Sequence, residues 1–338
     1  MNNKEEKYNK FALTREMMEV PEIIRGFDPG SALQFVQSIT SRKGLFLTGE
    51  GSSRIFPAKR AIYSSMGKNF SFPVLTEAAT QAIEYDLRNF AVFIASNSGQ
   101  TKEAIQLAAV LKKQKHPAVF GMTANQNTKL EELVSVTHLL SCGKEKAVAA
   151  SKSVVEQGLF YDSLLRLIRG EKMDGLKTLA EQTLLALSTK IEAGITDIIS
   201  KADIVYFAGR NNGVAEELAL KTNEIIRKKS DFLEGTFALH GIEEVMSNNE
   251  VLIWIEPFTG EQEKFYERLV KGVGMKIIAI SAKKTMFPTI TIPDGGEYAE
   301  YVQLAAGWNL LAEAGIALGI NLDKATRARK VGNEYTAE

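Results

Sequence analysis

The chain has 338 residues, of which 45% are hydrophobic and 24% are charged, and its 41 basic and 41 acidic side chains cancel. It can bury a sizeable core in about two domains, but it lacks the basic excess of a nucleic-acid binder. Its one cysteine and three histidines exclude an internal disulfide and a Cys/His metal cluster.

The N-terminus is polar and charged, without the apolar run of a signal peptide. No segment approaches the ~20 apolar residues that a membrane span needs. We therefore expect a soluble, cytoplasmic protein that has no membrane or nucleic-acid partner and needs no metal and no cofactor.

Short apolar runs alternate with longer helical patterns along the chain. Near-continuous apolar runs of this length are typical of parallel strands that helices cover on both faces. Strand–helix alternation is the signature of an α/β fold. The predicted strands are GLFLTG (44–49), FAVFIAS (90–96), PAVFGMT (117–123), DIVYFAG (203–209), EVLIWIE (250–256) and MKIIAIS (275–281).

The second three strands repeat the first three in order and spacing, and each strand is followed by a polar turn and an amphipathic pattern. The repeat predicts two similar, doubly wound, flavodoxin-like α/β/α domains with parallel sheets, although an unrelated pair of α/β domains is the alternative. The predicted parts are an N-terminal helical segment (1–30), a first domain (31–170), a connecting helix (171–200) and a second domain with a C-terminal tail (201–338).

The strand at 90–96 ends in the polar turn SNSGQT, just before a predicted helix. Such hydroxyls either cap the helix or, with its first N–H groups, bind an anion such as phosphate. The corresponding turn of the second half carries Glu256 and Pro257 and makes a poor anion cradle. A bound phosphate is therefore expected in the first half only.

The turns GEGSS and SNSGQT, inside a doubled α/β unit, resemble those of the sugar isomerase (SIS) domain family. The closest resemblance is to two-domain members: the isomerase half of glucosamine-6-phosphate synthase and related amino-sugar-phosphate deaminases and deglycases. It covers nearly the whole chain. The resemblance implies that the phosphate binds to Ser53, Ser96, Ser98 and Thr101, with further substrate contacts from Ser52, Asn97 and Gly99.

The stretch KAVAASKSVVEQ resembles the family's V-A-S-T-K segment, which borders the sugar. This resemblance implies substrate contacts from Val148 and Ser151. Ala150 stands where the synthase has a hydroxyl, so one hydrogen bond to the substrate is expected to be absent.

Lys221 and Glu224 are three residues apart in a predicted helix and share one face. Taken alone they indicate a solvated ion pair, and His240 alone indicates a structural histidine. The family has a lysine, a glutamate and a histidine at these spacings. The resemblance implies that Glu224 moves the proton between C1 and C2, His240 opens the sugar ring, and Lys221 holds sugar hydroxyls or the developing enolate charge.

Two regions depart from the family pattern. The histidine loop is one residue longer than in the family, with Thr236 in place of a glutamate and Ile242 in place of a proline. These differences put the family's leaving group or amine donor in question for this chain. The tail INLDKATRARK resembles the family's D-x-P-R-x-L-x-K, with Ala325 for the proline. This match implies a Schiff-base role for Lys330 and equates Arg327 with the tail's arginine, the alternative being a solvated basic tail.

These features predict a metal-independent enzyme that acts on a 6-phosphorylated amino sugar or amine-linked sugar, as a deaminase or deglycase. The alternatives are a simple aldose–ketose isomerase and a non-catalytic sugar-phosphate-binding regulator. We do not expect the synthase's full reaction, because its glutaminase half does not precede the first sugar domain, and residues 1–30 are too short for a regulator's helix-turn-helix domain. The family precedent also implies a homodimer with sites at the subunit interface.

Overall fold

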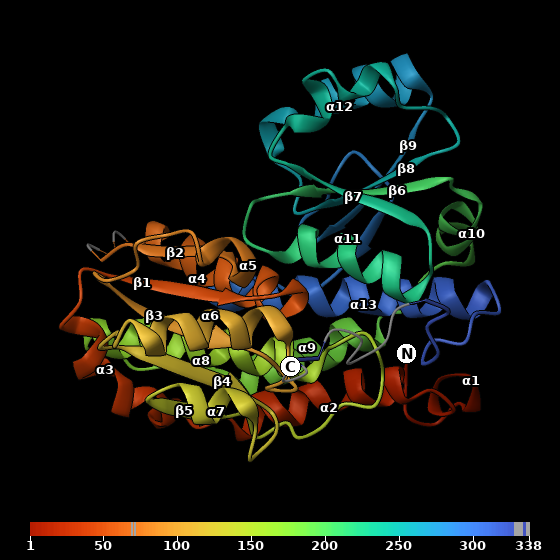
Figure 1. Ribbon diagram of the computed structural model, residues 1–338. Coiled ribbons are helices and arrows are strands. Elements are labelled where there is room, and N and C mark those ends of the chain that lie inside the picture. The colour runs from red at the N-terminus through yellow and green to blue at the C-terminus, as the bar shows by residue number, and fades with distance from the viewer. Residues whose placement is uncertain (69, 71, 328–333, 336–338) are drawn as a thin grey trace. The chain divides into compact units, whose positions relative to one another are not determined.

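The computed structural model describes all residues except 69, 71, 328–333 and 336–338. In the described residues, ten strands form two five-stranded parallel sheets (Figure 1). The first sheet has β1 (Gly44–Gly49), β2 (Val74–Ala78), β3 (Phe90–Ala95), β4 (Val119–Thr123) and β5 (Val136–Leu139). The second has β6 (Ile204–Gly209), β7 (Lys229–Glu234), β8 (Val251–Ile255), β9 (Lys276–Ser281) and β10 (Thr289–Thr291).

The chain forms two compact units, which we name after their sheets. The first-sheet unit comprises residues 22–145, 150–176 and 329–338, and the second-sheet unit comprises residues 1–21, 146–149 and 177–328. Both units are discontinuous in sequence, because the N-terminal residues and the short segment 146–149 cluster with the second sheet.

The helices of the first-sheet unit are α3 (Leu33–Thr40), α4 (Ile55–Gly67), α5 (Ala79–Ala82), α6 (Lys102–Lys113), α7 (Lys129–Leu133) and α8 (Lys152–Arg169). Those of the second-sheet unit are α1 (Glu6–Asn9), α9 (Leu176–Ser188), α10 (Ala193–Lys201), α11 (Val214–Ile225), α12 (Gln262–Phe265), which continues as a π-helix (Tyr266–Val273), and α13 (Ala299–Ala317). Helix α2 (Ala12–Gly26) belongs mainly to the second-sheet unit.

The two sheets have the same topology. Their strand orders are β2-β1-β3-β4-β5 and β7-β6-β8-β9-β10, so each strand of the first half has its counterpart in the second. All pairings are parallel. The predicted repeat and the doubly wound α/β class are therefore confirmed.

All six predicted strands form, as β1, β3, β4, β6, β8 and β9. The four strands that the sequence did not reveal are β2, β5, β7 and β10, which are the edge strands of the two sheets. Edge strands are partly exposed and carry polar residues, as in KSDFLE of β7, so they lack the continuous apolar run that marks a buried strand.

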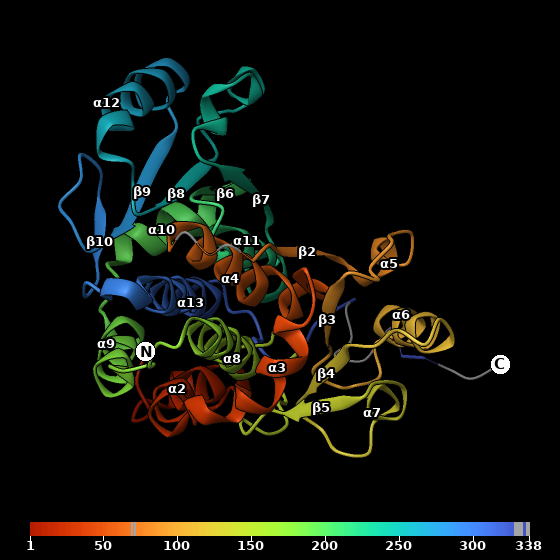
Figure 2. The same ribbon diagram turned by 90° about the vertical axis from the view of Figure 1, so that its left-hand side faces the viewer.

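Helices cover both faces of the first sheet, with α5, α6 and α7 on one face and α3, α4 and α8 on the other (Figure 2). Aromatic rings fill the second of these layers. Phe35 of α3 packs edge-on against Phe93 of β3 and Phe160 of α8, with ring centroids 5.2 and 5.5 Å apart. Such edge-to-face pairs contribute beyond the area that they bury.

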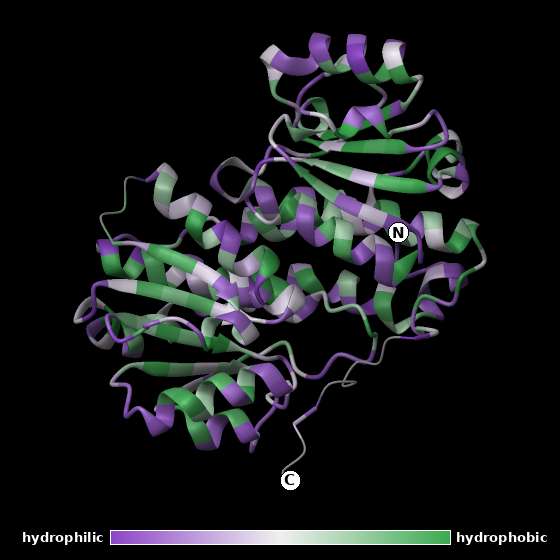
Figure 3. Ribbon diagram, turned by 45° about the horizontal axis from the view of Figure 1, so that its top comes forward, coloured by the Kyte–Doolittle hydropathy of each residue, from purple (hydrophilic) through white to green (hydrophobic). Residues whose placement is uncertain are grey.

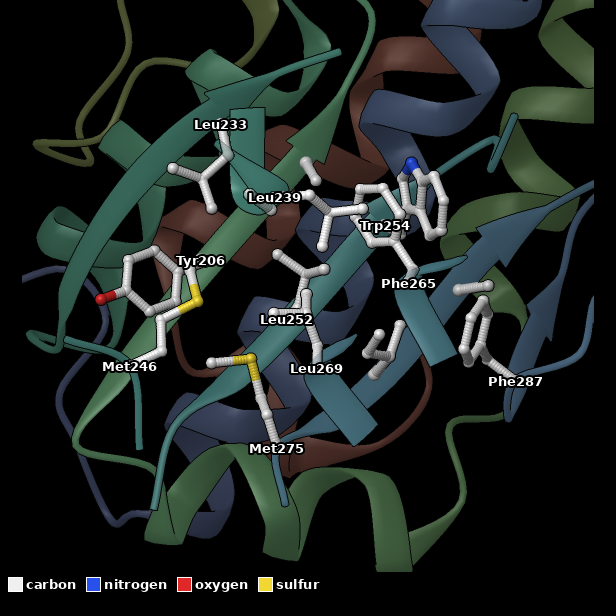
Figure 4. Close-up of a cluster of buried hydrophobic side chains, with 14 residues drawn as sticks. Tyr206, Leu233, Leu239, Met246, Leu252, Trp254, Phe265, Leu269, Met275 and Phe287 are labelled. Carbon is white, nitrogen blue, oxygen red and sulfur yellow. The ribbon is translucent and has the colours of Figure 1, made fainter. Parts of the chain in front are cut away.

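In the second-sheet unit, a cluster of buried side chains lies between the sheet and the helical layer that includes α12 (Figure 4). Trp254 of β8 stacks on Phe265 of α12 with ring centroids 3.8 Å apart. Figure 3 shows the apolar strands and the two-sided helices that such layers require.

Helix α13 is apolar almost all round, and its residues 301–312 are buried within the single chain. Burial within the chain accounts for the apolar composition of this part of the helix. Among the helices that the structure describes, none has both the length and the apolar character needed to cross a membrane.

Candidate functional site

The two predicted phosphate turns follow neighbouring strands. Gly49 and Ala95, at the ends of β1 and β3, are paired in the sheet, so the turns Gly51–Ser53 and Ser96–Thr101 start at the same edge. The order β2-β1-β3 also makes this the point where the connections leave in opposite directions. Ligands of doubly wound sheets bind at such switch points, so the fold puts the predicted phosphate hydroxyls where an anion can be received.

The hydroxyls of the second turn bond mainly to one another and within the turn. Ser96 Oγ lies 2.8 Å from Thr101 Oγ1, and the backbone N–H of Gln100 donates to Ser98 Oγ over 3.1 Å. Thr101 occupies the N-cap position of α6, yet its side chain accepts no capping hydrogen bond. The capping explanation therefore does not account for Thr101.

Gly99 gives this turn its shape. Its φ of +65° lies in the left-handed region, and a Cβ added there would come within 2.4 Å of the Thr128 side chain. Glycine alone fits this close approach without strain. Within the turn, the N–H groups of Gly99 and Gln100 donate to the Ser96 carbonyl and to Ser98 Oγ.

Glu145, which sequence reasoning missed, supports this turn through buried hydrogen bonds. Its carboxylate is buried and accepts hydrogen bonds from Asn97 Nδ2 at 2.7 Å and from the backbone N–H groups of Ser151 and Lys152 at 2.7 and 2.8 Å. The N-terminus of α8 thus already holds an internal anion. Asn97 and the fully buried Ser151 are both engaged by Glu145, so in this structure they act as supports of the turn.

The corresponding turn of the second-sheet unit carries its own anion. The Glu256 carboxylate accepts hydrogen bonds from Ser281 Oγ at 3.0 Å and from the backbone N–H of Ala282 at 2.6 Å. These donors are therefore occupied internally. The expectation that this turn is a poor cradle for phosphate stays a prediction.

Glu224 lies near the end of α11 and lines a pocket of about 500 Å³ in the second-sheet unit. Its side chain is 24% exposed. The pocket also includes Val148, so two predicted site residues meet here, together with the predicted tail residue Arg327. The full lining is Val148, Asn223, Glu224, Arg227, Lys228, Lys229, Ala325, Thr326 and Arg327.

Lys221 lies behind Glu224. Its ammonium is fully buried and forms ion pairs with Glu224 at 2.8 Å and with Glu217 at 3.3 Å. Burial by itself lowers the pKa of Lys221, but the two carboxylates more than offset this and hold its pKa above the ordinary value. Lys221 is absent from the pocket lining, so it orients Glu224 in this structure, whereas the resemblance implied direct contact with the sugar.

Glu217 is the second partner that sequence reasoning missed. It precedes Lys221 by one helical turn and is fully buried. The i,i+4 spacing was visible in the sequence, but such pairs are usually solvated, and only burial distinguishes this one.

Replacing Lys221 with methionine is expected to lower the free energy of unfolding by about 3–5 kcal/mol, because it leaves buried carboxylate charge without its cation. Urea unfolding followed by circular dichroism measures this. The control is Lys201→Met, since Lys201 forms an exposed pair with Asp197 and should contribute under about 1 kcal/mol. Equal losses for both variants would contradict a buried ion-pair network.

Two buried or half-buried carboxylates position the segments that border the Glu224 pocket. Glu16 of α2 accepts hydrogen bonds from the backbone N–H groups of Lys146 and Ala147, next to Val148. Asp323 accepts from the backbone N–H groups of Ala12 and Leu13 at 2.7 and 2.8 Å. These contacts fix the segment 146–148 and the chain leading to residues 325–327.

His240 lies away from Glu224 in this unit. Lys229, at the start of β7, lines the Glu224 pocket. The six residues of β7 extend about 20 Å to its other end, and His240 follows that end, exposed, with Nε2 3.2 Å from Thr236 Oγ1. The second-sheet unit therefore does not bring the predicted acid–base pair together.

The predicted Schiff-base residue Lys330 lies outside the described residues. Beyond it, the backbone of Glu334 bridges to Thr101, and Tyr335 N–H donates to the Gln100 carbonyl at 2.9 Å. Tail residues thus contact the phosphate turn within the first-sheet unit, a contact that sequence reasoning did not anticipate. Among the described residues, no group of three or more His, Cys, Asp or Glu side chains could hold a metal ion.

Comparisons with known proteins agree with this fold. No curated protein sequence matches the chain. The solved structures that it resembles include the C-terminal domain of glucosamine-fructose-6-phosphate aminotransferase from Francisella tularensis, with a TM-score of 0.77 at 17% identity, covering 94% of this chain and 98% of that one. Tagatose-6-phosphate ketose/aldose isomerase from Escherichia coli gives 0.77 at 16% identity, covering 95% and 98%.

Glucosamine-6-phosphate deaminase from Thermotoga maritima is similarly close, with a TM-score of 0.73 at 18% identity, covering 96% of this chain and 98% of that chain. At these identities the likeness shows a shared fold. By sequence, residues 38–167 match the model of the SIS domain. The expected resemblance is thereby confirmed for residues 38–167, which are similar to the SIS domain.

Proposed function

We propose that this protein is an enzyme that acts on a 6-phosphorylated sugar bearing an amine, as a deaminase or deglycase. The observation that carries the proposal is the environment of Glu224. Among the described residues that line its pocket it is the one carboxylate, and it is held from behind by the buried ion pairs of Lys221. The aminotransferase and deaminase among the similar structures support an amine-bearing substrate.

The chemistry requires a base beside the carbon that loses its proton. A proton next to a carbonyl or iminium group is weakly acidic, and a positioned carboxylate removes it and returns it to the neighbouring carbon. In the proposed reaction Glu224 does this between C1 and C2, while Lys221 keeps it oriented. His240 opens the ring, Lys330 remains the predicted Schiff-base residue, and the turns at Ser53 and Ser96–Thr101 bind the phosphate.

The purified protein, incubated with 6-phosphorylated hexoses, amino sugars and sugar–amino-acid adducts, tests this function. Released ammonia, free amino acid and hexose phosphate are quantified by mass spectrometry. Release of an amine from at least one substrate is expected. Interconversion of aldose and ketose without any release would support the second candidate, an isomerase, which the similar tagatose-6-phosphate isomerase fold favours. No conversion of any substrate would refute both.

The double variant Ser98→Ala, Thr101→Ala is expected to weaken substrate binding at least tenfold, because each lost hydrogen bond to a charged group is worth ~1.5–3 kcal/mol. Isothermal titration calorimetry measures the affinity. The control is Thr40→Ala, Ser41→Ala, which removes two exposed hydroxyls of the same unit at the end of α3. A collapsed melting temperature with unchanged affinity would mean that the turn only caps its helix.

A further inference from the structure

The pocket beside Glu224 is strongly basic. Four cationic side chains line it, those of Arg227, Lys228, Lys229 and Arg327, against the single carboxylate of Glu224. That carboxylate is already paired with Lys221. The pocket therefore carries an excess of positive charge that Glu224 does not neutralise, and in a concave site such charge attracts anions.

The four cationic side chains differ in the hydrogen bonds that they already make within the protein. Lys228 Nζ donates to the Ala202 carbonyl over 2.7 Å, and one terminal nitrogen of Arg227 donates to the carbonyls of Asn321 and Lys324. Lys229 and Arg327 are exposed, and their side chains have no partner in the described part of the chain. These two are the side chains that can turn fully toward a bound anion.

The backbone conformation of Arg227 supports a binding role for this pocket. Its φ of +56° lies in the left-handed region, just after α11, at a position where glycine is usual because other residues are strained by roughly 1–2 kcal/mol. Strained residues of this kind cluster at binding and catalytic sites. Arg227 lines the Glu224 pocket, and its guanidinium holds the segment that leads to Arg327.

We infer that this basic pocket binds a carboxylate on the amine that leaves, so that the substrate is a 6-phosphorylated sugar joined to an amino acid. The inference rests on the proposed function. If Glu224 acts on C1 and C2 and the phosphate is held by the turn of the first sheet, then the group beside Glu224 is whatever C1 or C2 carries. Ammonia offers nothing for these cations to bind, whereas an amino acid offers a carboxylate that arginine and lysine recognise.

The reaction balances with water as the co-reactant. For a ketose that carries the amine on C1, Glu224 takes a proton from C1, and the electron pair forms the C1–C2 enaminol. Return of the proton to C2 leaves a C1 iminium, to which water adds. The C1–N bond then breaks with its electron pair on nitrogen, and the products are the aldose 6-phosphate and the free amino acid.

A pair of matched substrates tests the inference: the 6-phosphorylated ketose adducts of glycine and of methylamine, which differ only in the carboxylate. The wild-type protein is expected to prefer the glycine adduct at least ~10-fold in kcat/KM. Lys229→Gln and Arg327→Gln should each lower kcat/KM for the glycine adduct at least ~10-fold and leave that for the methylamine adduct within about twofold. Lys201→Gln, an exposed lysine on α10, is the control and should change neither.

Binding measurements separate this inference from the proposed function. Isothermal titration calorimetry with the two adducts and with fructose 6-phosphate measures binding to the pocket even if neither adduct is turned over. Binding without turnover would overturn the proposed function but not this inference. Tighter binding of the glycine adduct, lost in the Arg327→Gln protein, supports the carboxylate pocket. Equal affinity for both adducts overturns it. An equal loss of fructose 6-phosphate binding in Arg327→Gln also overturns it, because the pocket would then bind the phosphate.

Discussion

Replacing Glu224 with glutamine is expected to lower turnover at least ~100-fold, the lower end of what general-base catalysis contributes, with little change in substrate affinity. Glutamine keeps the size of the side chain, and its amide oxygen can still accept a hydrogen bond from Lys221. What it loses is the ability to take a proton. Steady-state and single-turnover kinetics on the identified substrate separate this loss from an effect on binding.

The matched control for this prediction is Glu234→Gln. Glu234 is also a glutamate of the second-sheet unit, but it is exposed and lies at the far end of β7 from the Glu224 pocket. Its replacement should leave turnover near the wild-type value. The acid–base assignment is wrong if Glu224→Gln keeps near-full turnover, and a loss confined to Glu234→Gln would transfer the role to that residue.

The buried strands could be predicted from the sequence because their apolar residues are consecutive in the chain. A strand such as VLIWI of β8 is buried on both faces and must be apolar throughout, so its run of residues reveals it. The edge strands cannot be recognised in this way. In β7, exposed and half-buried residues alternate before the buried Leu233, and the pairing of β7 with β6 is a property of the assembled sheet.

The candidate site, too, could be predicted from the sequence only in part. The phosphate turn was visible because hydroxyls, a glycine and a helix start lie within a few residues of one another. Glu145 and Glu217 were not visible, since their importance comes from burial and from partners such as Asn97 and Lys221. The basic pocket was missed for a related reason: Arg227 and Arg327 are far apart in sequence, and only the fold puts them in one lining.

The separation of Glu224 from His240 has a consequence for assembly. β7 keeps them at opposite ends of the second sheet, so a site that uses both needs His240 from another copy of the chain. The loop that carries His240 has exposed apolar side chains, with Phe237 51% and Val245 77% exposed. Exposed apolar side chains on a loop suit packing against a partner, and we therefore propose a homodimer with sites shared across its two-fold axis.

Mixing Glu224→Gln protein with His240→Ala protein is expected to restore activity that neither has alone. In a two-fold symmetric dimer each site takes Glu224 from one subunit and His240 from the other. A mixed dimer then has one site with both defects and one intact site. After full subunit exchange of equal amounts, half of the dimers are mixed, so the sample should regain about a quarter of wild-type activity. Mass spectrometry of differently tagged subunits confirms the exchange, and a mixture of two Glu224→Gln preparations is the control. Samples that have exchanged subunits and still show no activity would mean that each site takes both residues from one chain.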